Sequence, residues 1–119
     1  MPDGPIFNIY GNKLQKVKVA FLGTGNSVGF EVFEFIDPPH EPKQSSEFEY
    51  FRSGFFHIAV TAPDVEEACK RAVENGGKQI GETVTVGDDE RTLYVSDPWG
   101  NVVEVLSCSF EALLANREG

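Results

Sequence analysis

The chain of 119 residues carries a formal net charge of −9, so it is acidic overall. Because few basic groups are available to displace counterions from phosphates, this charge argues against nucleic acid or an anionic membrane as a partner. The length and the 40% share of hydrophobic residues predict one globular domain, and the chain is too short for two independent cores.

The first 54 residues predict strands followed by a linker. VAFLGTGNSVGFEVF (19–33) has the pattern of a strand, a glycine-containing turn and a second strand. PIFNIYGNK (5–13) is expected to be a further strand, by comparison with the second half of the chain. Residues 38–54, which are rich in proline, serine and charge, predict a linker.

The next 53 residues (55–107) predict the order strand, helix, strand, strand, strand. The helix has signals at both ends, since Asp64 and Glu67 have capping-box spacing and an Asn-Gly-Gly run at 75–77 terminates it. The predicted segments are FFHIAV (55–60), TAPDVEEACKRAVENGG (61–77), KQIGETVTV (78–86, broken at Gly81), RTLYVSD (91–97) and NVVEVLS (101–107).

The two halves contain a partial internal repeat. LYVSDPWGNVVEVL (93–106) and residues 19–33 both run strand, turn, strand and end in an apolar–Glu–Val–apolar tetrapeptide, which aligns Glu31 with Glu104. The first copy, residues 5–37, is shorter than the second by about 20 residues, the size of one strand plus one helix. It therefore lacks a counterpart of FFHIAV and of the helix that follows.

Glu104 and His57 are candidate site residues because each interrupts an apolar strand. Alternation directs Val103 and Val105 toward the helix and Glu104 away from it, and the same rule places His57 on the face of Glu104. Imidazole and carboxylate groups suit zinc, iron, manganese, nickel or cobalt. From the residues alone, two alternatives stay open: a core histidine with a hydrogen-bond partner, and a carboxylate on a solvated sheet face.

His57, the D-P-W-G-N turn (97–101) and Glu104 together resemble the glyoxalase, bleomycin-resistance and ring-cleaving dioxygenase families of the vicinal oxygen chelate superfamily. The resemblance implies an α+β fold, in which two βαβββ modules form a cupped mixed sheet around one divalent metal ion. The chain 1–119 then forms a single glyoxalase-like domain. Its expected parts are an incomplete first module (5–37), a linker (38–54), a complete second module (55–108) and a C-terminal helical tail (109–119).

The resemblance also implies metal ligands on the first and fourth strands of each module. Carried over by position, these are His57 and Glu104 from the second module and Glu31 from the first, for a zinc, nickel, iron or manganese ion. The ligand expected on the missing strand has no position in this chain. Three alternatives stay open: a three-ligand site, a homodimer in which a second copy supplies the strand, and an inactive truncated homologue.

Glu31 favours the lyase and isomerase members of the superfamily, for which the resemblance implies glutamates on both fourth strands, over the ring-cleaving dioxygenases. Glu31 and Glu104 are then the expected catalytic residues, because a metal-stabilised enolate requires a carboxylate that moves the proton. The expected lining of an apolar substrate pocket is Phe21, Phe33, Phe35 and Phe55, and the alternative is that these side chains belong to the ordinary core. The alternative function is a metal-free protein that sequesters an apolar small molecule, as bleomycin-resistance members do.

The remaining features favour a cytoplasmic protein. No apolar run approaches the roughly 20 residues of a membrane-spanning helix, and MPDGPIFNIY at the start lacks the pattern of a secretion signal. Cys69 and Cys108 fit no zinc-binding spacing, so we expect two free thiols in a reducing compartment. FEALLANRE (110–118) predicts a short helix with Phe110 on its apolar side.

Overall fold

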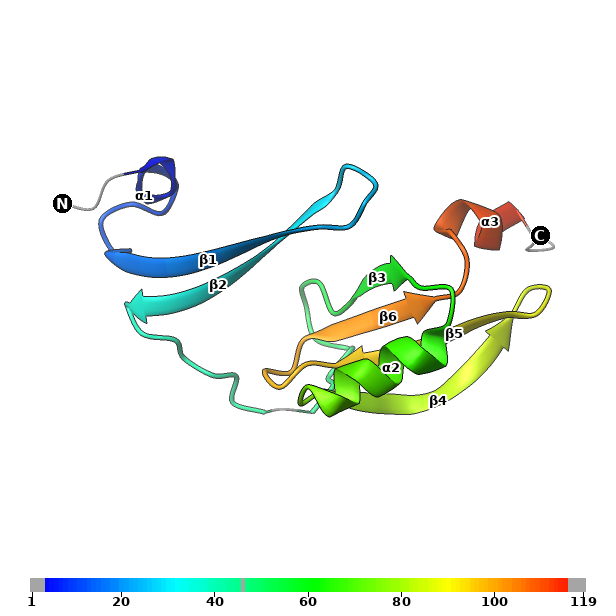
Figure 1. The fold of residues 1–119 in the computed structure, drawn as a ribbon. Coiled ribbons are helices and arrows are strands. Elements are labelled where there is room, and N and C mark those ends of the chain that lie inside the picture. The colour runs from blue at the N-terminus through cyan, green and yellow to red at the C-terminus, as the bar shows by residue number, and fades with distance from the viewer. Residues whose placement is uncertain (1–3, 46, 116–119) are drawn as a thin grey trace. The chain divides into compact units, whose positions relative to one another are not determined.

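The structure, a computed structural model, describes residues 4–45 and 47–115. The chain divides into two compact units, Met1–Pro42 and Lys43–Gly119. The boundary between them falls inside the predicted linker, 38–54. The elements labelled in Figure 1 are α1 (Pro5–Tyr10), β1 (Lys16–Gly23), β2 (Gly29–Asp37), β3 (Ile58–Thr61), α2 (Val65–Glu74), β4 (Lys78–Val86), β5 (Glu90–Ser96), β6 (Val102–Leu106) and α3 (Phe110–Ala115). The fold is α+β, as predicted.

The first unit is a helical turn followed by an antiparallel hairpin of β1 and β2. The prediction of a strand over 5–13 is wrong, because Pro5–Tyr10 forms α1. Proline suits the start of a helix because its ring already fixes φ near the helical value. It also has no backbone N–H group, and in the first turn of a helix such a group would lack a partner within the helix. Gly11, with φ of 77°, ends the helix and donates its N–H to the Phe7 carbonyl at 2.9 Å.

The second unit contains a four-stranded mixed sheet in the order β3-β6-β5-β4, with β3 parallel to β6 and the other pairs antiparallel. The predicted order strand, helix, strand, strand, strand is confirmed. The first strand is shorter than predicted, since β3 begins at Ile58 and His57 lies directly before it. Gly81 has a φ of 68° and lies where the pairing of β4 with β5 shifts register. The predicted break of this strand at Gly81 is therefore present.

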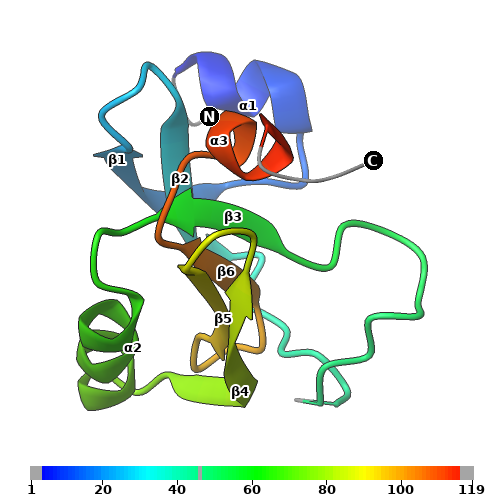
Figure 2. The same ribbon diagram turned by 90° about the vertical axis from the view of Figure 1, so that its right-hand side faces the viewer.

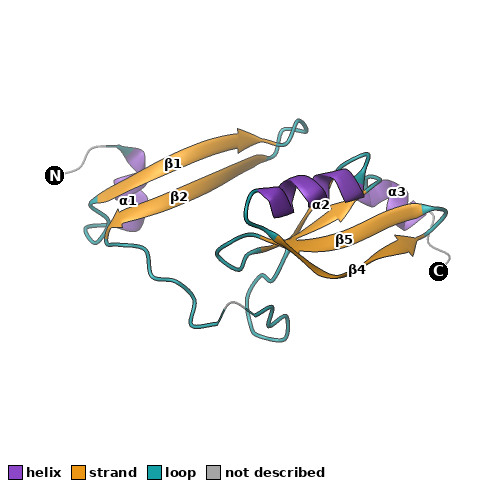
Figure 3. Ribbon diagram, turned by 60° about the horizontal axis from the view of Figure 1, so that its bottom comes forward, coloured by secondary structure: helices purple, strands orange, loops and turns teal. Residues whose placement is uncertain are grey.

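The helix α2 packs on one face of this sheet, and the core lies between them (Figures 2 and 3). Its N-terminus is capped as predicted, because the Asp64 carboxylate accepts a hydrogen bond from the Glu67 N–H at 3.1 Å. At the other end the Gly77 N–H bonds to the Ala72 carbonyl at 2.8 Å. The buried core residues are Val65, Cys69, Leu93, Val95 and Val105, with Val103 packed against them.

This arrangement confirms that Val103 and Val105 face the helix, so Glu104 points to the opposite side of the sheet. The two cysteines are free, as predicted. The helix α3 forms over Phe110–Ala115, with Phe110 more than half exposed, while the rest of the predicted C-terminal helix, residues 116–118, lies outside the described residues.

Candidate functional site

The side chains of His57 and Glu104 meet on the sheet face opposite α2. In the parallel pair β3–β6, Ala59 lies opposite Glu104, and His57 precedes Ala59 by two positions, so both side chains project to one side. His57 Nε2 lies 3.2 Å from Glu104 Oε1, and the two side chains are 23% and 19% exposed. The predicted juxtaposition of these two residues is thus present within the second unit.

The distance between these two atoms fits ligation of a common metal ion. Nitrogen and oxygen ligands bind zinc at about 2.0–2.2 Å, so two donors on one ion lie about 3 Å apart. Among the described residues, however, no three His, Cys, Asp or Glu side chains gather closely enough to hold an ion. The His57–Glu104 pair therefore represents part of a coordination set, and any further ligand has to come from outside the pair.

The third predicted ligand, Glu31, lies in the first unit. It is exposed near the start of β2, where its register partner on β1 is Phe21. A ligand role for Glu31 therefore stays a prediction.

Strand β5 places two hydroxyl groups beside the pair. Thr92 Oγ1 donates a hydrogen bond to Glu104 Oε2 at 2.8 Å, and the Tyr94 hydroxyl lies 3.4 Å from His57 Nε2. Burial, and secondly the negative charge of Glu104, raise the pKa of Tyr94 above its ordinary value of about 10, so this hydroxyl is protonated at neutral pH as an ordinary tyrosine also is. In contrast, His57 Nδ1 is buried and has no hydrogen-bond partner among the described residues.

The sequence contained a signal for Thr92 and Tyr94 that the prediction missed. The D-P-W-G-N turn sets the register of β5 against β6, with Ser96 opposite Val102 and Tyr94 opposite Glu104. The Asp97 carboxylate holds this turn, because its Oδ1 accepts the Trp99 and Asn101 N–H groups at 2.9 and 2.8 Å. Counting outward from the turn therefore identifies the residues of β5 that flank Glu104.

An aromatic cluster surrounds His57, and we define it as Phe48, Phe56, His57 and Tyr94. The His57 ring lies 4.8 Å from Phe56 and 4.9 Å from Tyr94 between ring centroids, and Phe48 lies 6.1 Å from both Phe56 and Tyr94. Phe48 comes from the predicted linker, whose composition gave no indication of a role at the site. The cluster places apolar surface next to the polar pair.

The predicted pocket residues are arranged differently from this cluster. Phe33 and Phe35 contact each other on β2 in the first unit, with ring centroids 5.7 Å apart, and Tyr10 of α1 packs against Phe33. Phe21 is 77% exposed on β1, and Phe55 in the second unit is fully exposed. Their role as a substrate lining stays a prediction.

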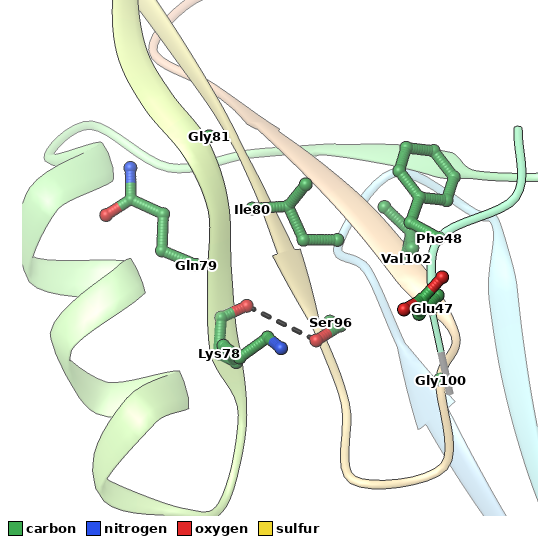
Figure 4. Close-up of a pocket in the computed structure, with 9 residues that line it drawn as sticks. All are labelled: Glu47, Phe48, Lys78, Gln79, Ile80, Gly81, Ser96, Gly100 and Val102. Atoms are coloured by element: carbon green, nitrogen blue, oxygen red, sulfur yellow. Dashed lines mark hydrogen bonds between the residues drawn. The ribbon is translucent and has the colours of Figure 1, made fainter. Parts of the chain in front are cut away.

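A shallow pocket of about 300 Å³ lies beside the cluster in the second unit (Figure 4). Its lining combines apolar groups with polar groups: Glu47, Phe48, Lys78, Gln79, Ile80, Gly81, Ser96, Gly100 and Val102. It includes neither His57 nor Glu104, and Phe48 is the member that it shares with the aromatic cluster. The hollow and the polar pair are thus adjacent features rather than one enclosed cavity.

The βαβββ unit, with its histidine before the first strand and glutamate in the fourth, defines a protein of the glyoxalase fold. The family model of the Glyoxalase/Bleomycin resistance protein/Dioxygenase superfamily matches residues 6–105, and the chain belongs to this superfamily.

A glyoxalase family protein from Bacillus cereus has a similar solved structure, with a TM-score of 0.65 and 21% sequence identity. The similarity covers 76% of this chain and 60% of the Bacillus cereus chain, so the present chain spans well under the full length of that protein. No curated protein matches the sequence. In the described part of the chain, no helix has the length and apolar character needed to cross a membrane.

Proposed function

We propose that the chain is a metal-dependent lyase or isomerase of the glyoxalase type that acts on a small, apolar substrate. The observation that carries this proposal is the 3.2 Å approach of His57 Nε2, directly before β3, to Glu104 Oε1 on the adjacent parallel strand β6. Both are common ligands of zinc, iron, nickel and manganese, and both side chains keep some exposure, as a site that admits substrate requires.

When bound, a divalent metal ion supplies the Lewis acidity that stabilises an enolate formed from a substrate with two neighbouring oxygens. The chain's own residues bind and orient the substrate. Phe48, Phe56 and Tyr94 offer apolar surface beside the polar pair, and the protonated Tyr94 hydroxyl can donate a hydrogen bond to a substrate oxygen. Glu104 or Glu31 takes the proton from carbon and returns it to the neighbouring carbon.

The further ligands are proposed to come from Glu31 and from a second copy of the chain in a homodimer. The four-stranded sheet has β3 and β4 at its edges, and an open strand edge pairs readily with another chain. Sedimentation at micromolar concentration is expected to give a dimer. A monomer that nevertheless holds stoichiometric metal contradicts the dimer and leaves the metal site intact.

The second candidate is a metal-free protein that binds an apolar small molecule. Among the described residues Nδ1 of His57 has no hydrogen-bond partner, which favours a metal-free protein, because a histidine that ligates a metal normally donates its other N–H to an acceptor. The aromatic cluster suits an apolar or aromatic ligand equally well with or without metal.

The metal content of the purified protein distinguishes these two functions. Protein prepared without chelator and supplied with zinc, nickel or iron is expected to hold stoichiometric metal, and a His57→Ala/Glu104→Ala variant is expected to lose it. A His40→Ala/Glu74→Ala variant, which changes the same residue types at exposed positions, serves as the matched control and is expected to retain it. If the wild type holds no metal under these conditions, the enzyme proposal fails and the binding protein replaces it.

A further inference from the structure

The buried hydroxyl of Thr92 contacts a carboxylate on the neighbouring strand. The Thr92 side chain is buried on β5, one of the two interior strands of the sheet, where the residue is 7% exposed. Its hydroxyl donates to Glu104 Oε2 at 2.8 Å, across from β5 to β6. The partner of this buried hydroxyl is thus an ionisable side chain and not a backbone carbonyl.

The hydrogen bond restricts the orientation of the Glu104 carboxylate. One oxygen, Oε2, is held by Thr92, so the other, Oε1, is turned toward His57 Nε2 at 3.2 Å. A β-branched side chain has few accessible χ1 rotamers in a strand, so the direction of the Thr92 hydroxyl is itself restricted. Without this donor, Oε2 loses a charge-assisted hydrogen bond in a partly buried place, and the carboxylate is free to rotate.

We propose that Thr92 is the positioning residue of the site, and that its hydroxyl fixes Glu104 so that one carboxylate oxygen faces His57. The part of this inference that concerns metal affinity rests on the proposed function. The geometric part concerns the His57–Glu104 pair itself, so it can be tested in metal-free protein.

Zinc affinity, measured by competition with a chromophoric chelator, tests the first part. Loss of a group that orients a metal ligand typically weakens binding about 10–100-fold, which is the loss expected for Thr92→Val. Thr92→Ser, which keeps the hydroxyl, is expected to restore most of the affinity. Thr85→Val removes a hydroxyl at an exposed position of β4 and is expected to leave the affinity unchanged. Equal losses in Thr92→Val and Thr92→Ser overturn the proposal.

A double-mutant cycle on stability tests the second part independently of metal. His57→Ala, Glu104→Gln and their combination are made in the wild type, in Thr92→Val and in Thr92→Ser, and are unfolded with urea in the presence of chelator. The His57–Glu104 coupling is expected to fall to less than half in Thr92→Val and to persist in Thr92→Ser. Full coupling in Thr92→Val, or no coupling in the wild type, refutes the positioning role. A wild type that fails to bind zinc refutes the proposed function, and the cycle still decides the role of Thr92.

Discussion

The two units of the chain differ in how they bury their apolar residues. The second unit has a contiguous core between α2 and its sheet, in which Leu93 is 1% exposed. The first unit has a hairpin and one helical turn, and its apolar strand residues are largely exposed, for example Phe21 at 77% and Leu22 at 50%. Among its described residues, Leu14 is the one buried hydrophobic residue.

The difference indicates which part of the module provides stability. A two-stranded hairpin is marginally stable by itself, whereas a helix packed on three or more strands provides a core. The second unit has both the strand before the helix and the helix itself, and the first unit has no counterpart of this pair in its described residues. The hairpin therefore presents apolar surface that its own unit does not cover.

The largest effect is expected from Leu93→Ala in the core of the second unit. Removing a fully buried leucine is expected to lower the free energy of unfolding by about 2–5 kcal/mol. The favourable free energy of transferring the side chain from water into the core is lost, and a cavity remains. Urea denaturation followed by the fluorescence of Trp99, the single tryptophan, reports on this unit.

Phe21→Ala in the hairpin provides the comparison for this experiment. Because Phe21 is largely exposed, its loss is expected to change the free energy by less than about 0.5 kcal/mol. A decrease in the free energy of unfolding as large as that of Leu93→Ala shows that the hairpin is covered in solution. The two units then do not differ in how they bury their apolar residues.

An intermediate effect is expected from Gly77→Ala, at the close approach of α2 to β5. A Cβ atom there lies 2.8 Å from the Ser96 carbonyl oxygen and 2.9 Å from the Ala72 carbonyl oxygen, and both are backbone atoms. The helix and strand have to move apart, which costs about 1–3 kcal/mol. Gly23→Ala at the end of β1 meets no atom within 4 Å and is expected to be neutral or slightly stabilising in the same urea titration.

Most of the second unit could be predicted from the sequence because its signals are local. Asp64 and the glycines after the helix mark the ends of α2, and alternation gives the faces of β6. The helical turn α1 was missed because six residues, PIFNIY, are too short to distinguish a helix from a strand by periodicity. Phe48 was missed because a tertiary contact leaves no pattern in a segment of irregular structure.

For the site, the sequence predicted that His57 and Glu104 share a face, since this follows from strand parity. The contacts of Thr92 and Tyr94 depend on the register between β5 and β6, which the D-P-W-G-N turn sets. The position of Glu31 relative to the pair depends on how separate parts of the chain assemble, and no local pattern in the sequence encodes it.

A small effect on the site face of the second unit concerns its pH dependence and depends on Tyr94. Its pKa is raised above the ordinary value of about 10, chiefly by burial and then by the Glu104 charge, so the folded state binds the phenolic proton more tightly than the unfolded state. This contribution to stability is complete below about pH 10 and is lost as the pH rises through the pKa of the folded state.

Tyr94→Phe is expected to change stability by less than about 1 kcal/mol at pH 8 and to make the decline above pH 10 less steep. Urea midpoints measured from pH 8 to about pH 11 check this. Equal slopes in wild type and Tyr94→Phe show that the hydroxyl is exposed in solution, so that the site face of the sheet is no better protected than the hairpin.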